Sequence, residues 1–317
     1  MSGLPRRLTL APSSDRTYLH AMDAIRLSPP RRLTLPVDNR WGAGEMSVLD
    51  FGPADRPVDL VFVHANGFNA LTYRRLLAPL AGTLRIWAPD LRGHGRTQLP
   101  ADPSRRRGWS DHRDDLVALL DALDGPPAVL AGHSMGGTSA LLAAAERPQQ
   151  VAGLVLLDPV IWRRWVVMAF HLPLLDRMAS RIPLVKSARR RRAVFDSREQ
   201  AFAAYAGRGA FRGWPEAMLS DYLADGLIET DEGLVLACPP EWEASNYAAQ
   251  SHDPWRALAR LDRPVRILKA ETGSTCAVPE APRGLPHVTV ETVAGGTHFF
   301  PMLQADVARD ALFDAAV

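Results

Sequence analysis

Residues 131–137, AGHSMGG, place a serine where its hydroxyl could serve as a nucleophile. Gly132 and Gly136 flank Ser134 two positions away on either side, in a G-x-S-x-G pattern. Such a serine needs a sharp turn from strand to helix, and larger flanking side chains would collide with the neighbouring backbone. PAVLAG before the turn is strand-like, and MGGTSALLAAAERP after it is helix-like. The pattern predicts Ser134 as the nucleophile of an acyl transfer.

His298 is the histidine best placed to act as the base. Among nine histidines, it follows the last predicted strand, HVTVETV, after a Gly-Gly turn. A neutral imidazole near pH 7 can take the Ser134 proton during attack and return it to the leaving group. His133, beside the nucleophile, is expected to lie beneath the turn.

Two backbone amides are predicted to hold the developing oxyanion. Met135 begins the helix after Ser134, so its N–H can point at an anion. A second donor is expected from the loop HANGFNA, which follows the strand-like run DLVFVH. Gly67 allows a tight turn there, so the Phe68 amide is the predicted donor, with the Asn66 side chain as the alternative.

The elements that must position these residues alternate along the chain. Short apolar runs rich in β-branched residues predict strands at 59–64, 84–89, 127–132, 151–158, 264–270 and 287–293. LTYRRLLAPLA, DHRDDLVALLDAL and residues 135–146 have helical spacing of apolar positions between them. This alternation predicts an α/β fold with a mostly parallel sheet and helices on both faces.

The alternation stops between residues 160 and 252, which predicts a mainly helical cap inserted after the sixth strand, with helix-like pieces and turns in place of strands. The core is then 30–159 and 253–317. PRRLTL occurs at residues 5–10 and again at 30–35. We expect the second copy to be the first strand and residues 1–29 to be a poorly ordered N-terminal extension, in which Met22 is an alternative start.

Charges within the predicted cap are sorted. Residues 163–212 hold 12 Lys or Arg and 3 Asp or Glu, whereas residues 214–253 hold 9 acidic residues and no Lys or Arg. The basic run ARRRRAV has no interleaved aromatics, so it predicts a solvated helix face paired with the acidic half and not a nucleic-acid site. An apolar stripe could line a substrate channel or attach the cap to the core; its members are Trp162, Trp165, Phe170 and Leu172.

Composition sets further limits. A formal charge of +2 gives no general reason to expect nucleic-acid or membrane partners. Cys238 and Cys276 form neither a disulfide framework nor a zinc pattern, and no apolar run near the N-terminus is long enough for a signal peptide. We therefore expect a cytoplasmic protein with reduced thiols and no stable membrane insertion; the oligomeric state stays open.

Residues from about 45 to 315 resemble an α/β-hydrolase. HANGF is similar to the oxyanion loop of that fold, APDLRGHGRT to the exit of its fourth strand, GHSMGG to its nucleophile elbow and GGTHFFPM to its histidine loop. The four landmarks occur in the order of the fold. The resemblance implies that His64 braces the oxyanion loop and that Asp90 and His94 are structural.

The acid departs from the commonest family pattern. Most members carry an acid in a segment resembling G-E-x-D after strand 7, and AETG occupies residues 270–273 here, so Gly273 replaces the carboxylate. Asp158, in LVLLDPV, ends strand 6 and resembles the acid of pancreatic-type lipases. Glu271 is the rival, two positions early. A histidine without an acid loses about four orders of magnitude in rate, so a partner is required and Asp158 is preferred.

These residues and the resemblance together predict a serine hydrolase that cleaves small hydrophobic esters through Ser134, His298 and Asp158. No metal or organic cofactor is implied. Hydrolysis of a thioester or a C–C bond is the alternative reaction within the same fold. A binding protein that has lost turnover is the alternative from another class.

Overall fold

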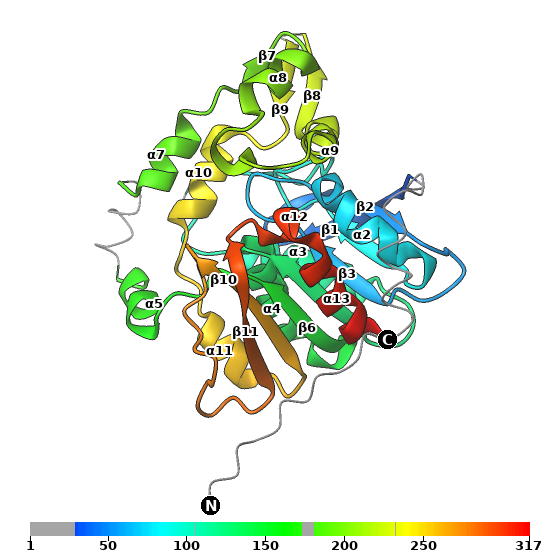
Figure 1. Cartoon of the computed structure of the whole chain (residues 1–317), viewed down its shortest axis with the longest axis vertical. Coiled ribbons are helices and arrows are strands. Elements are labelled where there is room, and N and C mark those ends of the chain that lie inside the picture. Colours follow the sequence, from blue (N-terminus) through cyan, green and yellow to red (C-terminus); the bar gives the residue numbers. More distant parts are fainter. Residues whose placement is uncertain (1–28, 105, 173–180, 232) are drawn as a thin grey trace, which may run out of the picture.

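An eight-stranded sheet forms the centre of the computed structural model, which describes residues 29–104, 106–172, 181–231 and 233–317 (Figure 1). The strand order is β1-β2-β4-β3-β5-β6-β10-β11. The strands span β1 Arg31–Asn39, β2 Gly42–Phe51, β3 Leu60–Val63, β4 Ile86–Pro89, β5 Ala128–His133, β6 Val151–Leu157, β10 Val265–Thr272 and β11 Val288–Thr297. Pairs β1–β2 and β2–β4 are antiparallel and the others are parallel, which confirms the predicted sheet.

Apolar side chains on both faces of each central strand explain why the sheet is covered twice. In β3, Leu60 and Phe62 join one buried cluster, whereas Val61 and Val63 join the other. The strands of a parallel sheet that is buried on both faces typically have such continuous apolar sequences. One face packs against α2 (Arg74–Leu77), α12 (Phe300–Leu303) and α13 (Ala305–Ala316). The other packs against α3 (Ser110–Asp121), α4 (Met135–Glu146) and α11 (Pro254–Arg260).

The segment predicted as one helix at LTYRRLLAPLA is broken into three short turns. These are η2 (Ala70–Tyr73), α2 and η3 (Ala78–Gly82); a further 3₁₀ turn, η4 (Pro148–Gln150), precedes β6. Pro79 explains the break between α2 and η3, because a proline within a helix removes a backbone donor and clashes with the preceding turn.

Most of the described elements between β6 and α11 form a layer above the carboxyl ends of the strands, and the first helix lies beside the sheet (Figure 1). The helices of this segment are α5 (Arg164–Phe170), α7 (Pro183–Arg189), α8 (Arg198–Tyr205), α9 (Glu216–Gly226) and α10 (Pro240–Ala248), with the turn η5 (Gly209–Phe211). A three-stranded antiparallel sheet is also present, made of β7 (Val194–Phe195), β8 (Leu227–Thr230) and β9 (Gly233–Leu236). The expectation that strands are absent here is therefore wrong. LIET and GLVL are short runs with apolar and β-branched residues that lie close together in the sequence, a pattern typical of a hairpin.

The two oppositely charged halves of this layer contact each other, as predicted. Arg191 forms a partly buried ion pair with Glu243, and Arg189 forms an exposed one with Glu241 at 3.0 Å. The acidic half also contacts arginines of the core. These pairs are Arg74–Asp221, Arg75–Asp221, Arg32–Asp225 and Arg96–Asp225. The sorted charges thus serve contacts within the cap and between the cap and the core.

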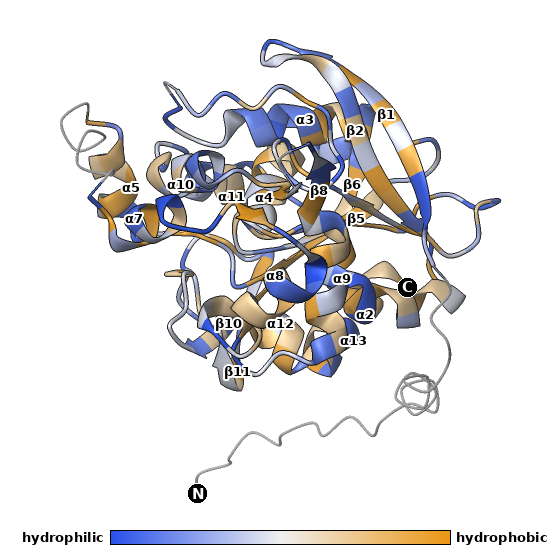
Figure 2. Ribbon diagram, turned by 90° about the horizontal axis from the view of Figure 1, so that it is seen from above, coloured by the Kyte–Doolittle hydropathy of each residue, from blue (hydrophilic) through white to orange (hydrophobic). Residues whose placement is uncertain are grey.

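The predicted apolar stripe does not act as a unit. Trp165 and Leu172 are 68% and 57% exposed, on and after α5, which projects from the edge of the molecule in Figure 2. Trp162 instead packs against the buried cluster below and donates its indole N–H to Gln250. Neither predicted role fits the exposed members.

Both cysteines are buried and unpaired. None of the helices within the described residues combines the length and apolar composition that a membrane crossing requires. The predicted N-terminal extension falls almost entirely on residues 1–28, which lie outside the described part of the chain.

Candidate active site

Ser134 sits at the turn between β5 and α4 in a conformation that an L-residue rarely adopts, with φ 54° and ψ −120°. A Cβ on Gly136 would lie 2.3 Å from the His64 carbonyl oxygen, and one on Gly132 would lie 2.6 Å from the Gly136 carbonyl carbon. Only glycine fits at both positions. Gly136 therefore lets the turn pack against the backbone of residues 63 and 64, and Gly132 lets β5 lie close to the start of α4, as the G-x-S-x-G pattern predicts.

Strand register brings Ser134 and Asp158 to the same edge of the sheet. His133 of β5 lies opposite Leu157 of β6, so the two residues follow neighbouring strand ends. Asp158 has φ 43°, and among the described residues these two are the only non-glycine residues with positive φ. Conformations of this kind cost on the order of 1–3 kcal/mol each and cluster at functional sites.

A continuous hydrogen-bonded chain joins the three predicted residues. His298 Nε2 lies 3.0 Å from Ser134 Oγ, and His298 Nδ1 lies 2.6 Å from Asp158 Oδ2. Because the Asp158 carboxylate can only accept, Nδ1 carries the proton and Nε2 is left to accept from the serine hydroxyl. Ser134 is 8% exposed and the His298 side chain 22% exposed, while Asp158 is fully buried. This geometry suits proton transfer away from Ser134.

Donors from the neighbouring strand end surround the Asp158 carboxylate. Ser274 Oγ donates at 2.5 Å, the Ala270 amide at 2.9 Å and the Thr275 amide at 3.1 Å. Burial alone would raise the pKa of Asp158, but the hydrogen bond and charge of His298 and the bonds from Ser274 and Ala270 outweigh it and lower that pKa. Asp158 is therefore a carboxylate at neutral pH.

The rival acid, Glu271, lies elsewhere. Its carboxylate is exposed and accepts a hydrogen bond from the Gly295 amide at 2.7 Å. It has no contact with His298. Gly273 takes a positive φ of 69° in the turn that leads into Ser274. The segment that lacks the family's usual acid thus supplies hydrogen-bond donors to the acid on the next strand.

Sequence reasoning missed the hydroxyl donors Ser274 and Thr275. The available signal was their position, since the two hydroxyl residues lie two and three positions after the end of β10, the strand that pairs with β6. Pairing of β6 with β10 places them beside Asp158. Recognising them requires the strand order, which the sequence gives only through the resemblance.

The amide predicted for Phe68 is already used inside the loop. It donates to the Ala65 carbonyl at 3.2 Å, and the Gly67 amide donates to His94 Nε2 at 3.2 Å. The Asn66 side-chain amide, the alternative donor, bonds the carbonyl of Glu243 at 3.0 Å. The Phe68 prediction does not hold in this conformation, because the turn occupies its N–H.

The backbone amides of Asn66 and Met135 have no hydrogen-bond partner within the described part of the chain. Every other amide from Ala65 to Ala70 has an acceptor. Buried amides rarely stay unpaired. The two amides come from the two loops that meet at Ser134, where Gly136 packs on the His64 carbonyl.

His133 and His64 have the structural roles expected of them. His133 is fully buried; its Nε2 lies 2.8 Å from the His298 carbonyl and its Nδ1 lies 2.7 Å from the Tyr73 hydroxyl. His64 Nδ1 lies 2.8 Å from the Ala65 carbonyl, and its Nε2 accepts from the Leu91 amide. Burial lowers the pKa of His133 to about 3 and that of His64 to about 4, so both are neutral.

Aromatic side chains pack close to the histidine loop. The Phe299 ring lies 5.3 Å from the His298 ring, 6.2 Å from Phe68 and 6.4 Å from Trp214, measured between centroids. Trp214 belongs to the cap and joins the same buried cluster as the sheet. The surroundings of the reacting groups are accordingly apolar.

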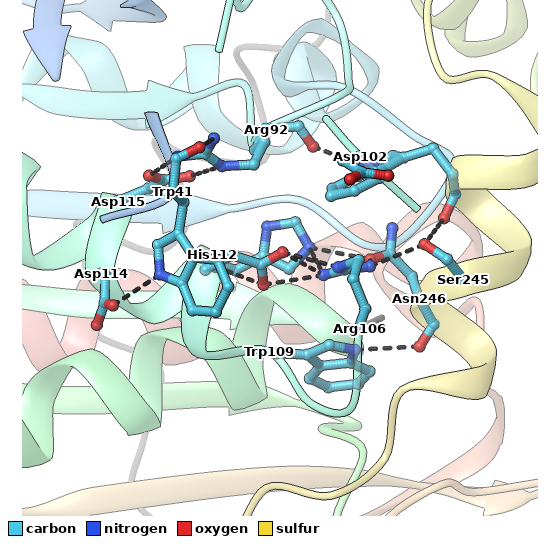
Figure 3. A network of polar contacts seen from close by, with 12 residues as sticks. Trp41, Arg92, Asp102, Arg106, Trp109, His112, Asp114, Asp115, Ser245 and Asn246 are labelled. Atoms are coloured by element: carbon cyan, nitrogen blue, oxygen red, sulfur yellow. Dashed lines mark hydrogen bonds and ion pairs between the residues drawn. The ribbon is translucent and has the colours of Figure 1, made fainter. Parts of the chain in front are cut away.

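A cavity of about 790 Å³ lies away from these residues, between the 100–110 loop, α3, α4 and α11. Neither Ser134, His298 nor Asp158 lines it. Its walls contain Arg40, Arg92, Arg106, Arg107, Arg113, Arg256 and Arg260. Several residues around it are shown in Figure 3. The cavity is therefore separate from the triad.

Comparison with known proteins places the chain in a family. Over 322 residues it is 29% identical to the magnesium-chelatase 30 kDa subunit of Rhodobacter capsulatus, covering 95% of this chain and 98% of that protein. It is 38% identical to lipase LipV of Mycobacterium tuberculosis over 119 residues, 37% of this chain and 42% of that protein. The crystal structure of E-2-(acetamidomethylene)succinate hydrolase, 22% identical, matches with a TM-score of 0.70 over 90% of this chain and 98% of that one. The model of the alpha/beta hydrolase family matches residues 60–311, and the chain belongs to that family.

Proposed function

We propose that this protein is a serine hydrolase that cleaves carboxylic esters through an acyl-enzyme on Ser134. The observation that carries the proposal is the unbroken chain Ser134 Oγ–His298 Nε2 and His298 Nδ1–Asp158 Oδ2, at 3.0 Å and 2.6 Å. A nucleophile, a base and a group that orients the base, each within hydrogen-bond reach of the next, are the parts that nucleophilic catalysis needs.

Each group has one role in the proposed mechanism. Ser134 Oγ attacks the ester carbonyl while its proton passes to His298 Nε2, and Asp158 stabilises the imidazolium that forms. The amides of Met135 and Asn66 donate to the oxyanion; Asn66 takes the place predicted for Phe68. The C–O bond then breaks, and His298 returns the proton to the departing alkoxide. Water, deprotonated by His298, releases the carboxylic acid and restores Ser134.

The expected substrate is a small hydrophobic ester. Phe68, Trp214 and Phe299 surround the histidine loop with apolar surface, which favours an uncharged acyl or alcohol group. No residue in this mechanism requires a metal or an organic cofactor.

The test is a series of p-nitrophenyl esters of increasing acyl length, assayed with the wild-type protein and with Ser134→Ala. We expect turnover that depends on Ser134, with kcat/KM highest for a short or medium apolar acyl group. Wild-type protein that hydrolyses none of the esters and does not react with a fluorophosphonate would overturn the proposal.

Cleavage of a thioester or a C–C bond is the second candidate reaction for this mechanism. The relatives include a 2-hydroxymuconate semialdehyde hydrolase of Pseudomonas, 38% identical over 36% of this chain, and the fold is shared with a thioesterase domain of a curacin pathway. The same three residues can serve thioester or C–C cleavage. Parallel assays with acyl thioesters and vinylogous diketones decide the scissile bond, and a kcat/KM above that for every ester would replace the ester proposal.

A non-catalytic role is the candidate from another class. Its support is the similarity, along nearly the whole chain, to a protein named as a magnesium-chelatase subunit. An intact and hydrogen-bonded Ser134 argues against it. Covalent capture of a fluorophosphonate by Ser134 separates the two, because a binding protein has no need of an activated serine.

A further inference from the structure

The side chain of Asn66 is held at both ends by cap helix α10. Its Nδ2 donates to the Glu243 carbonyl at 3.0 Å, and its Oδ1 accepts from Asn246 Nδ2 at 2.8 Å. Both bonds are buried and join residues about 180 positions apart in the chain. A buried amide satisfied in this way has one orientation, because each end meets a specific partner.

Arg106 fixes the orientation of Asn246. Its guanidinium donates to Asn246 Oδ1 and binds both oxygens of Asp111, at 2.7 Å and 2.9 Å. His112 Nε2 lies 3.0 Å from the same Asn246 oxygen, as Figure 3 shows. The backbone of Asn246 is held as well, since its carbonyl accepts from the Trp109 indole at 3.0 Å.

The hydrogen bonds run in one direction from Arg106 to α10. A guanidinium can only donate, so Asn246 must turn Oδ1 toward Arg106 and Nδ2 toward Asn66. Asn66 must then offer Oδ1 to Asn246 and Nδ2 to the Glu243 carbonyl, which can only accept. Flipping either amide would set donor against donor or acceptor against acceptor. The position of Asn66 is therefore determined by the cap and by Arg106.

We propose that Asn246, oriented by Arg106, is a positioning residue that holds the Asn66 backbone amide where the oxyanion forms. This inference rests on the proposed function, in which that amide is one of the two oxyanion donors. The side chain and the amide belong to the same residue, so a change in the side chain's anchors rotates the peptide that carries the donor. Formation of the oxyanion hole thus depends on the seating of a cap helix.

The test measures transition-state and ground-state binding separately. In Asn246→Leu and in Asn66→Ala, we expect kcat on the best ester to fall about 10- to 100-fold, with KM changing less than about 3-fold. The Ki of a trifluoromethyl ketone, which adds Ser134 and places an oxyanion in the hole, should rise by the factor that kcat/KM falls. The Ki of the matching methyl ketone should stay within about 2-fold.

Matched variants separate this role from general damage to the cap. Ser245→Ala removes another Arg106 bond on the same helix, 3.0 Å long, without touching Asn66, and should keep wild-type kcat. The double variant Asn66→Ala/Asn246→Leu should be no slower than the worse single variant, because both act through one bond. Asn66→Ala removes few atoms and keeps the test open if Asn246→Leu fails to fold.

Two outcomes overturn the inference. One is wild-type kcat and wild-type trifluoromethyl ketone Ki in folded Asn246→Leu, or in Asn66→Ala if Asn246→Leu does not fold. The other is an equal rise in Ki for the two ketones. Failure of the proposed function looks different, since wild-type protein would then show no Ser134-dependent turnover at all.

Discussion

Two neighbouring strand ends, those of β6 and β10, contribute different groups to the surroundings of His298. The end of β6 carries the carboxylate, Asp158, in a strained conformation with φ 43°. The end of β10 carries no acid that reaches His298, because Glu271 turns to the Gly295 amide. It carries instead the donors Ser274 and Thr275.

The difference shows how a buried carboxylate on one strand end can be surrounded by hydrogen-bond donors from the next. A buried carboxylate is costly unless it is hydrogen-bonded. Asp158 receives its bonds from the backbone and hydroxyls of the segment after β10, where Gly273 stands in place of an acid. The two strand ends are therefore complementary, because the β6 end carries the carboxylate and the β10 end carries its hydrogen-bond donors.

The largest expected effect comes from Ser134, the proposed nucleophile, which His298 links to Asp158 at the end of β6. Ser134→Ala should lower kcat on the best ester by about 10⁶-fold, because attack by Ser134 is the first chemical step. Steady-state assays with p-nitrophenyl esters measure it. A residual rate within about 100-fold of wild type would show that the serine is not the nucleophile.

The two rival acids should differ by orders of magnitude. Asp158→Asn keeps the shape of the side chain but offers His298 no carboxylate, and kcat should fall about 10⁴-fold. Glu271→Gln is the matched control. Among the described residues its carboxylate hydrogen-bonds only the Gly295 amide, so kcat should stay within about 2-fold of wild type. Inactivation by Glu271→Gln with retention by Asp158→Asn would reverse the assignment.

The donors of the β10 end should have a smaller effect. Ser274→Ala removes the 2.5 Å bond to Asp158 and leaves the amide bonds of Ala270 and Thr275 in place. We expect kcat to fall about 3- to 10-fold, because hydrogen bonds to charged groups contribute on the order of 1.5–3 kcal/mol and part is retained. Kinetics identical to wild type would mean that the Ser274 hydrogen bond to Asp158 is not needed for activity.

The buried histidines should make the folded protein less stable in acid. Burial lowers the pKa of His64 and His112 to about 4 and that of His133 and His252 to about 3. The fold favours the neutral rings, so their contribution to stability is complete above pH 6.5 and is lost as pH falls toward 4. Each ring should cost about 1.4 kcal/mol per pH unit in that window.

Urea unfolding at pH 7.5, 6.0 and 5.0 measures this slope. His252→Phe is a suitable control, because the His252 ring stacks on Trp109 with centroids 4.2 Å apart and its Nδ1 has no partner. A phenyl ring keeps the stack and cannot titrate. The variant should lose about 1.4 kcal/mol less per pH unit, and a slope equal to that of the wild type would contradict the role of His252.

The sequence could predict those residues whose position depends on their immediate neighbours in the chain. Ser134 is fixed by its flanking glycines and His298 by its place after the last strand. Asp158 followed from the missing acid at Gly273 and the strand order of the resembled fold. The sheet and its helices followed from apolar periodicity.

The remaining features depend on contacts between distant segments. Asn66 and Asn246 are 180 residues apart, and no local pattern links them. The Phe68 prediction failed because the closure of the turn on Ala65 decides which amides stay available. The small cap sheet was missed because its hairpin strands are only four residues long and lie among helices.

Reaction with a fluorophosphonate, followed by intact-mass and peptide-mass measurement, tests the central claim without knowledge of the natural substrate. Wild-type protein and Glu271→Gln should react at equal rates with one adduct on Ser134, whereas Asp158→Asn should react at least about 100-fold more slowly. Equal rates for Asp158→Asn and wild type, or an adduct on another residue, would contradict the claim that Asp158 activates Ser134 through His298.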